Sequence, residues 1–166
     1  MDFADIYDRY FDKVYNYVRY RVRLADAADD ITARVFEAAL GKAGTYDPAK
    51  GPEQAWLFGI ARNAVADWGR ARGRRAEVPL EGAFEGPGSD PRAEDILEGR
   101  EERERVLAAA AALDERSRDI MALKFSSGMT NREIAAMTGL GENNVGIIIY
   151  RAVKRMRELL GGSKSI

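Results

Sequence analysis

An acidic stretch rich in helix breakers, in the middle of the chain, limits the possible folds more than any other feature. Between Glu77 and about Pro91 the sequence has three prolines and three glycines among mostly polar neighbours. Such a segment offers too little apolar surface to join a core. We therefore expect two small domains, at residues 1–76 and 101–166, joined by a flexible acidic linker at 77–100.

The first domain has the apolar periodicity of helices. Apolar side chains recur every three or four residues over 3–22, which predicts a helix of six turns. A second stripe over 28–40 predicts another helix, with Asp26 as its N-cap. Glycines and an Asp-Pro pair predict a loop over 41–51, and a third helix is expected over 52–72.

The second domain is also expected to be helical, and it carries the sharper local signal. The sequence Thr130-Asn131-Arg132-Glu133 is a capping box, in which Thr130 and Glu133 each bond the other's backbone. Gly139 follows in a turn, and apolar residues at Val145 and Ile148 suit a helix-turn-helix. An ordinary helix pair in a bundle is the alternative for this segment taken alone. No segment alternates as a strand does, so the expected fold class is all-α.

Charge and aromatic residues are unevenly distributed. The net charge of −1 divides into +2 over residues 1–76, −7 over 77–104 and +4 over 105–166. Two basic regions on either side of an acidic one indicate a polyanionic partner. Most of the aromatic residues lie in the first domain, which predicts two different cores.

The absence of His and Cys makes an enzyme unlikely on composition alone. It excludes a Ser-His-Asp triad and any cysteine-ligated zinc. Asp29, Asp30 and Glu37 share a helix, but no second acidic motif faces them, so a magnesium-dependent enzyme is the weakest alternative. We expect no catalytic residue, no cofactor and no metal. The first residues lack a basic region and an apolar region, so we expect no signal peptide and a cytoplasmic location.

A basic, amide-bearing helix face closes the first domain. Arg62, Asn63, Asp67 and Arg70 share this face, and Arg74 and Arg75 follow it. Beside a glycine-rich loop, such a face is suited to hold phosphates and one or two unstacked bases. The alternative is a solvated helix whose two tryptophans, at positions 56 and 68, pack in the core.

Taken together, these motifs resemble those of bacterial extracytoplasmic-function (ECF) sigma factors over nearly the whole chain. The resemblance rests on Ala28-Asp29-Asp30-Ile31-Thr32, Ala55-Trp56-Leu57, Ile60-Ala61-Arg62-Asn63, Leu113-Asp114-Glu115-Arg116, Glu133-Ile134-Ala135, Gly139-Leu140 and Arg151-Ala152. It implies two helical domains, called regions 2 and 4, that bind core RNA polymerase and direct promoter recognition and opening. The main alternative function is a dimeric helix-turn-helix regulator that binds operators without polymerase.

The resemblance also implies roles for individual residues. Contacts to the polymerase clamp helices are expected from Asp29, Asp30, Thr32, Ala33, Arg34, Phe36 and Glu37. Recognition of the −10 element, with one base extruded into a loop pocket, is expected from Tyr46, Asp47, Lys50, Arg62, Asn63, Asp67, Arg70, Arg74 and Arg75. Recognition of the −35 element is expected from Thr130, Arg132, Glu142, Asn143, Asn144, Tyr150, Arg151, Lys154 and Arg155. Region 4 is also expected to meet the polymerase flap, and an anti-sigma factor, often membrane-bound in this family, is an expected partner.

Two segments depart from the family pattern. Family members usually have Thr-Val-Lys-Ser-Arg at the head of the recognition helix, where this chain has Asn144-Val145-Gly146-Ile147-Ile148. Base contacts are therefore expected from the neighbouring polar residues and Tyr150, and asparagine can address adenine. At Ala33-Arg34 the family commonly has a glutamine and an acidic residue, so individual polymerase contacts there differ.

Overall fold

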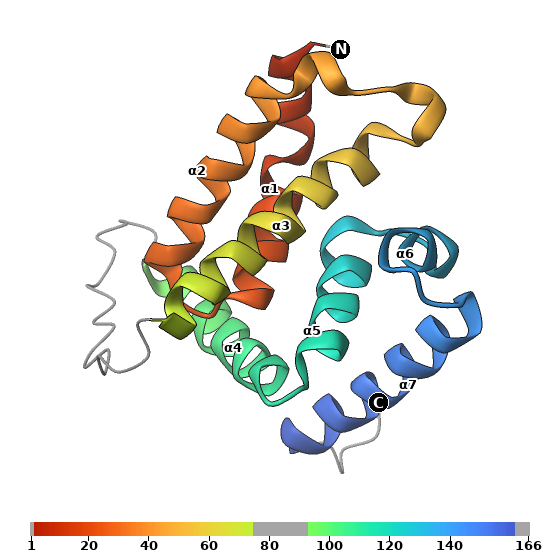
Figure 1. The fold of residues 1–166 in the computed structure, drawn as a ribbon. Coiled ribbons are helices and arrows are strands. Elements are labelled where there is room, and N and C mark those ends of the chain that lie inside the picture. The colour runs from red at the N-terminus through yellow and green to blue at the C-terminus, as the bar shows by residue number, and fades with distance from the viewer. Residues whose placement is uncertain (1, 75–92, 162–166) are drawn as a thin grey trace.

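Every regular element in the described part of the chain is helical, as the sequence predicts. The computed structural model describes residues 2–74 and 93–161. The first block holds α1 (Phe3–Arg21), α2 (Ala25–Gly41) and α3 (Glu53–Arg74). The second block holds α4 (Ala93–Ala111), α5 (Glu115–Ala122), α6 (Asn131–Thr138) and α7 (Glu142–Leu159) (Figure 1).

The helix starts show where local sequence signals succeed and where one fails. Thr130 and Glu133 form the predicted capping box at the start of α6. Asp26, in contrast, is not the N-cap of α2. The N-cap is Leu24, two residues earlier, so the helix begins at Ala25 and Asp26 lies in its first turn. There the carboxylate still favours the helix, because negative charge near an N-terminus complements the helix dipole.

Short turns occupy the segments between the longer helices. The predicted loop before α3 contains two 3-10 turns, η1 (Ala43–Thr45) and η2 (Pro48–Lys50). A π-helical turn, η3 (Leu123–Ser127), continues α5 and ends at Gly128, whose φ of 73° is one that glycine adopts without steric cost. Helix α4 begins at Ala93 and so includes the last part of the predicted linker. The rest of the predicted linker, residues 77–92, lies outside the described residues.

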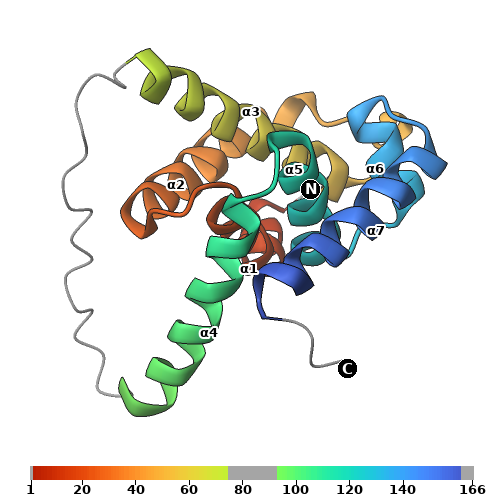
Figure 2. The same cartoon turned by 90° about the horizontal axis from the view of Figure 1, so that it is seen from below.

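The expectation of two different cores holds only in part, because the larger cluster of buried side chains runs through both blocks while a second, smaller cluster lies within the second block. The larger cluster includes Tyr17 and Phe58 from the first block together with Ile120, Leu123 and Ile134 from the second. The reason is that α5 and η3 pack directly against α1, while α6 approaches α3. Figure 2 shows α5 between the helices of the first block and α7. The larger cluster thus joins the aromatic-rich block to the aliphatic block.

Candidate nucleic-acid interface

A buried carboxylate joins the two blocks. Asp119, on α5, is 8% exposed. Its Oδ1 accepts hydrogen bonds from the Tyr17 hydroxyl at 2.6 Å and from Nη1 of Arg21 at 2.8 Å. Its Oδ2 accepts from Nη2 and Nε of Arg62 at 2.9 and 3.1 Å. Because Tyr17 and Arg21 belong to α1 and Arg62 to α3, this one carboxylate ties α5 to two helices of the first block. We call these four residues the Asp119 cluster.

The protonation states in the Asp119 cluster follow from burial and charge. Burial raises the pKa of the Tyr17 phenol, and the neighbouring Asp119 carboxylate raises it further, so Tyr17 stays a neutral donor. Burial on its own would lower the pKa of Arg21, but Tyr17 and Asp119 together hold it above its ordinary value. Two arginines therefore face one carboxylate, and the cluster keeps a surplus of positive charge.

Arg62, one of the predicted −10 residues, is held by the second block in this arrangement. Besides its two bonds to Asp119, its Nη1 donates to the carbonyl oxygen of Met137 on α6 at 3.3 Å. The rest of the predicted α3 face is open: Asn63, Asp67 and Arg70 are exposed, and the last two form an ion pair. Arg74 is the last residue of α3, and Arg75 lies outside the described residues.

The loop before α3 forms a cavity of about 460 Å³ together with α6. Its lining includes the predicted −10 residues Tyr46, Asp47 and Lys50 and the ring of Trp56. The Tyr46 and Trp56 ring centroids lie 5.5 Å apart, and the Tyr46 hydroxyl donates to the carbonyl oxygen of Gly51 at 3.2 Å. Asp47 caps η2 by accepting from the amide of Ala49 at 3.0 Å. Two aromatic side chains and a lysine thus line this cavity, and these are groups that can stack on a base and pair with a phosphate.

Helix α6 closes one side of this loop cavity, which the sequence did not indicate. Glu133, Ala136 and Met137 complete the lining. Local patterns carry no information about this contact, because the loop and α6 are about 85 residues apart in the sequence. The two elements meet only because the blocks share a core.

The predicted polymerase-binding helix presents part of its predicted surface. Asp29, Asp30, Ala33, Arg34 and Glu37 are exposed on α2, and Arg34 pairs with Asp30 at 3.0 Å. Thr32 and Phe36 are instead buried in the core, at 1% and 4% exposure, so they are not available to a partner on this surface. They lie on the stripe of α2 that the 3.6-residue period turns toward α1 and α3.

The helix-turn-helix of the second block has the predicted geometry. Gly139 ends α6 with a φ of 75°, which turns the chain into α7. The buried stripe of α7 is Val145, Ala152 and Met156. The predicted −35 residues are all exposed: Thr130, Arg132, Glu142, Asn143, Asn144, Tyr150, Arg151, Lys154 and Arg155. Thr130 uses its hydroxyl oxygen to cap α6, accepting from the amide of Glu133 at 3.1 Å. Ile147, which was not among the predicted residues, is exposed on the same helix.

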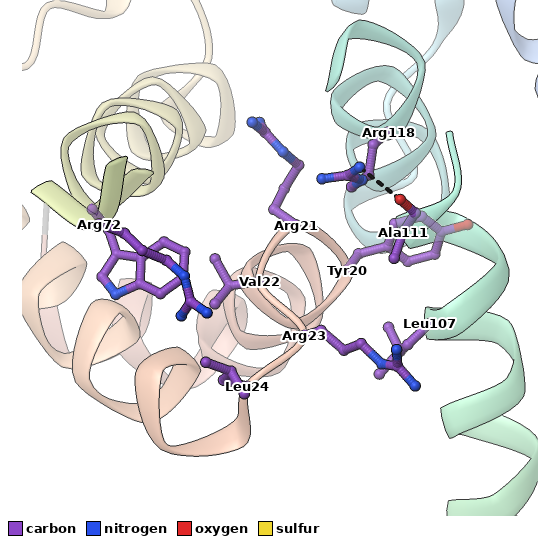
Figure 3. Close-up of a pocket in the computed structure, with 10 residues that line it drawn as sticks. Tyr20, Arg21, Val22, Arg23, Leu24, Arg72, Leu107, Ala111 and Arg118 are labelled. Atoms are coloured by element: carbon purple, nitrogen blue, oxygen red, sulfur yellow. Dashed lines mark hydrogen bonds between the residues drawn. The ribbon is translucent and has the colours of Figure 1, made fainter. Parts of the chain in front are cut away.

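A second, smaller cavity of about 200 Å³ lies where α1, α3, α4 and α5 meet, and four arginines line it (Figure 3). All four already have structural partners, and Arg23 pairs with Glu104 at 3.8 Å. Arg21 belongs to the Asp119 cluster, and Arg72 lies over the Trp68 ring, 5.1 Å from its centroid. Arg118 donates to the carbonyl oxygens of Ala110, Ala111 and Leu113 and so caps the end of α4. These arginines hold the junction of the helices together.

The described residues offer neither an acidic metal site nor a membrane span. No group of three or more acidic side chains there is placed to hold a metal ion. No helix among those residues combines the length and the apolar character needed to cross a bilayer.

Comparison with known proteins identifies the family. Residues 6–75 match the family model of sigma-70 region 2, and residues 103–156 match that of sigma-70 region 4. The chain is 32% identical over 158 residues to the ECF RNA polymerase sigma factor BldN of Streptomyces coelicolor, covering 95% of this chain and 60% of BldN. It is 31% identical over 156 residues to the ECF sigma factor RpoE of Cereibacter sphaeroides, covering 94% of this chain and 84% of that protein.

Solved structures agree with this family in fold. The sigma factor RpoE of Bartonella quintana, solved in complex with the anti-sigma factor NepR, matches with a TM-score of 0.75 at 21% identity, covering 98% of this chain and 99% of that one. CnrH, solved in complex with the cytosolic domain of CnrY, matches with a TM-score of 0.72 at 26% identity, covering 98% and 89%. The sequence matches to both regions, in the expected order along one chain, show that this protein belongs to the ECF sigma factors of the sigma-70 family.

Proposed function

We propose that this ECF sigma factor binds core RNA polymerase through the exposed side of α2 and reads a promoter with both blocks. In this proposal the loop before α3 and the α3 face recognise and open the −10 element, and α7 enters the major groove at −35. The partners are the clamp helices and flap of polymerase and the promoter DNA. The protein works in the cytoplasm, and it has no catalysis of its own because it supplies recognition to an enzyme.

The observation that carries the −10 assignment is the loop cavity beside the basic face of α3. Extruding a base from a duplex costs a few kcal/mol, which stacking and phosphate contacts offset. Tyr46 and Trp56 offer ring faces for an extruded base, and Lys50 is exposed beside them for the backbone. Asn63 and Arg70 are exposed about two and four turns further along α3. Aromatic rings for stacking and a lysine for phosphate contact are therefore available together in the loop before α3.

The packing of the two blocks supports a closed state that must open before promoter binding. Arg62 is engaged by Asp119, and α6 covers one side of the loop cavity. Separation of the blocks would release both features at once. In our proposal core polymerase drives this separation, so the free protein binds promoter DNA poorly and gains that ability in the holoenzyme.

An anti-sigma factor is the proposed negative partner. The arrangement of both blocks resembles that of CnrH, which was solved with the cytosolic domain of CnrY. A partner that binds across the two blocks would stabilise the closed state, by mass action, at the expense of the open one. Such a partner can be soluble or anchored in the membrane.

Run-off transcription with purified core polymerase tests the function. We expect specific transcripts only when this protein is added. Alanine substitutions at Asn63 and Arg70 are expected to reduce promoter opening, measured by permanganate reactivity of unpaired thymines, while leaving core binding unchanged. Charge reversal at Arg34 or Glu37 serves as the matched control, because it should weaken core binding first. Equal loss of core binding in the α3 variants, with opening intact, would contradict the assignment of this face.

A further inference from the structure

Two large apolar side chains lie on the exposed face of the recognition helix. Ile147 is 48% exposed and Tyr150 is 69% exposed. Asn143, Ile147, Tyr150 and Lys154 follow one another at steps of four, three and four residues, so they line one face of α7. The opposite face is the buried stripe described above. Ile147 and Tyr150 are therefore at the centre of the surface that α7 offers to a partner.

This apolar pair lies beside Gly146 and Ile148, the positions where family members usually have lysine and arginine, at the place where a recognition helix meets base edges. In a helix-turn-helix, residues in the first turns of the second helix contact the bases. Ile147 and Tyr150 are the sixth and ninth residues of α7, and they follow Asn143 and Asn144. Neither the isoleucine nor the neighbouring Gly146 can donate a hydrogen bond from its side chain to a base. An apolar side chain in the major groove has one specific apolar target, which is the C5-methyl group of thymine.

The charges around the pair favour nucleic acid over an apolar protein groove as the occupant. Arg151, Lys154 and Arg155 are exposed on the following turns of α7, and Arg132 is exposed on α6. Glu142 precedes the pair at the helix start, and Glu158, which lies 3.5 Å from Arg155, follows two turns later. Cations on the turns after an apolar centre are suited to phosphates that flank a base-reading surface.

We propose that Ile147, supported by Tyr150, reads thymine methyl groups in the −35 element, in a chain that has Gly146 and Ile148 where this family usually has lysine and arginine. This inference rests on the proposed −35 role of α7 and makes it specific: the preferred −35 element contains thymine at the position facing Ile147. Asn143 and Asn144 address the adjoining bases through hydrogen bonds, and Arg151 and Lys154 hold the phosphates.

Replacing thymine with uracil tests the inference, because the exchange removes only the methyl group. The probe is a promoter selected from random-sequence DNA by the holoenzyme, with each −35 thymine changed singly to deoxyuridine. Burial of one methyl group corresponds to about a fourfold change in binding. We expect wild-type holoenzyme to bind one of these uracil promoters about fourfold more weakly. Holoenzyme with Ile147→Ala should bind the thymine and uracil promoters equally.

Matched variants separate methyl reading from other roles. Arg151→Ala should weaken binding to both promoters by the same factor and reduce its salt dependence, as loss of a phosphate contact does. Ile147→Val should retain part of the discrimination. Because Ile147 is half exposed, Ile147→Ala should keep the thermal midpoint of the wild-type protein.

Three results would overturn the inference. The first is equal binding of the wild-type holoenzyme to the thymine and uracil promoters at every −35 position. In that case a promoter with a scrambled −35 element decides about the proposed function: weaker transcription would mean that α7 reads −35 without methyl contacts, and unchanged transcription would mean that the −35 role itself fails. The second result is unchanged discrimination between thymine and uracil in Ile147→Ala, which would assign the methyl contact to another residue. The third is weaker core polymerase binding by Ile147→Ala without DNA, which would place Ile147 in a protein interface.

Discussion

Removing the Asp119 carboxylate is expected to weaken the contact between the two blocks more than any other single change. In Asp119→Ala, Arg21 and Tyr17 lose their common acceptor while they remain largely buried. Removing one partner of a buried ion pair lowers the free energy of unfolding by about 3–5 kcal/mol, because the other charge stays buried without its partner. Arg62 is 31% exposed and can turn toward water, so we take the lower end, about 3 kcal/mol. For a chain of this size that corresponds to a fall in thermal midpoint of about 6–12 °C.

Circular dichroism and small-angle scattering together measure this effect. If the shared core makes the blocks one cooperative unit, Asp119→Ala unfolds in a single transition at lower temperature. If the blocks separate while staying folded, helicity is kept and the radius of gyration rises above about 15 Å, the value for a compact chain of 166 residues. In the second case the free variant should also bind promoter DNA more tightly than the wild type, because Arg62 is released.

Asp114→Ala is the matched control for this experiment. Asp114 caps the same helix, α5, by accepting from the amide of Ser117 at 2.8 Å, but it makes no contact in the Asp119 cluster. Loss of this cap costs about 1 kcal/mol and should not change promoter binding. A thermal midpoint for Asp119→Ala no lower than that of Asp114→Ala, with unchanged scattering and DNA binding, would refute the role given to the cluster.

Three further predictions concern single residues. An added Cβ at Gly146 would lie 3.6 Å from Nδ2 of Asn131, an ordinary contact, so Gly146→Ala should raise stability by up to about 1 kcal/mol in chemical denaturation. Gly139→Ala, at a φ of 75°, should lower it instead, and the opposite order would contradict the helix geometry. Because the pKa of Tyr17 is raised, the unfolded chain releases its phenolic proton near pH 10 while the folded chain retains it. The contribution of Tyr17 to stability should therefore be constant below about pH 10 and fall as the pH rises above it. Urea titrations at pH 8, 10 and 11 measure the free energy of unfolding, and its decrease with pH should be smaller in Tyr17→Phe than in the wild type. An equal decrease in both proteins would show that Tyr17 is not the titrating group. Thr130→Ala should cost about 1 kcal/mol by loss of the α6 cap, and Thr130→Ser should restore most of it, as thermal melts would show.

The sequence predicted those features that depend on neighbouring residues. The helices, the turn at Gly139 and the capping box at Thr130 follow from local periodicity and from side chains within four positions of one another. The same periodicity was enough to exclude Thr32 and Phe36 from the surface of α2, since both fall on its apolar stripe. They were included because the family resemblance covers the helix as a whole.

The features that the sequence did not predict depend on contacts between distant residues. Asp119 is 57 residues from Arg62 and 102 from Tyr17, and no local pattern marks it as the acceptor for both. The contribution of α6 to the loop cavity has the same origin. Ile147 was missed for a different reason, because an exposed isoleucine has meaning only once the face of α7 that it occupies is known.

The shared core gives the two blocks a contact whose strength depends on temperature. Hydrophobic stabilisation weakens on cooling, whereas ion pairs such as those of Asp119 do not depend on the same hydration of apolar surface. Cooling should therefore loosen the apolar part of the contact first and leave the Asp119 cluster as the main link between the blocks. The equilibrium between the closed state and the state with separated blocks, which binds the promoter in our proposal, would then shift with growth temperature even without a partner protein.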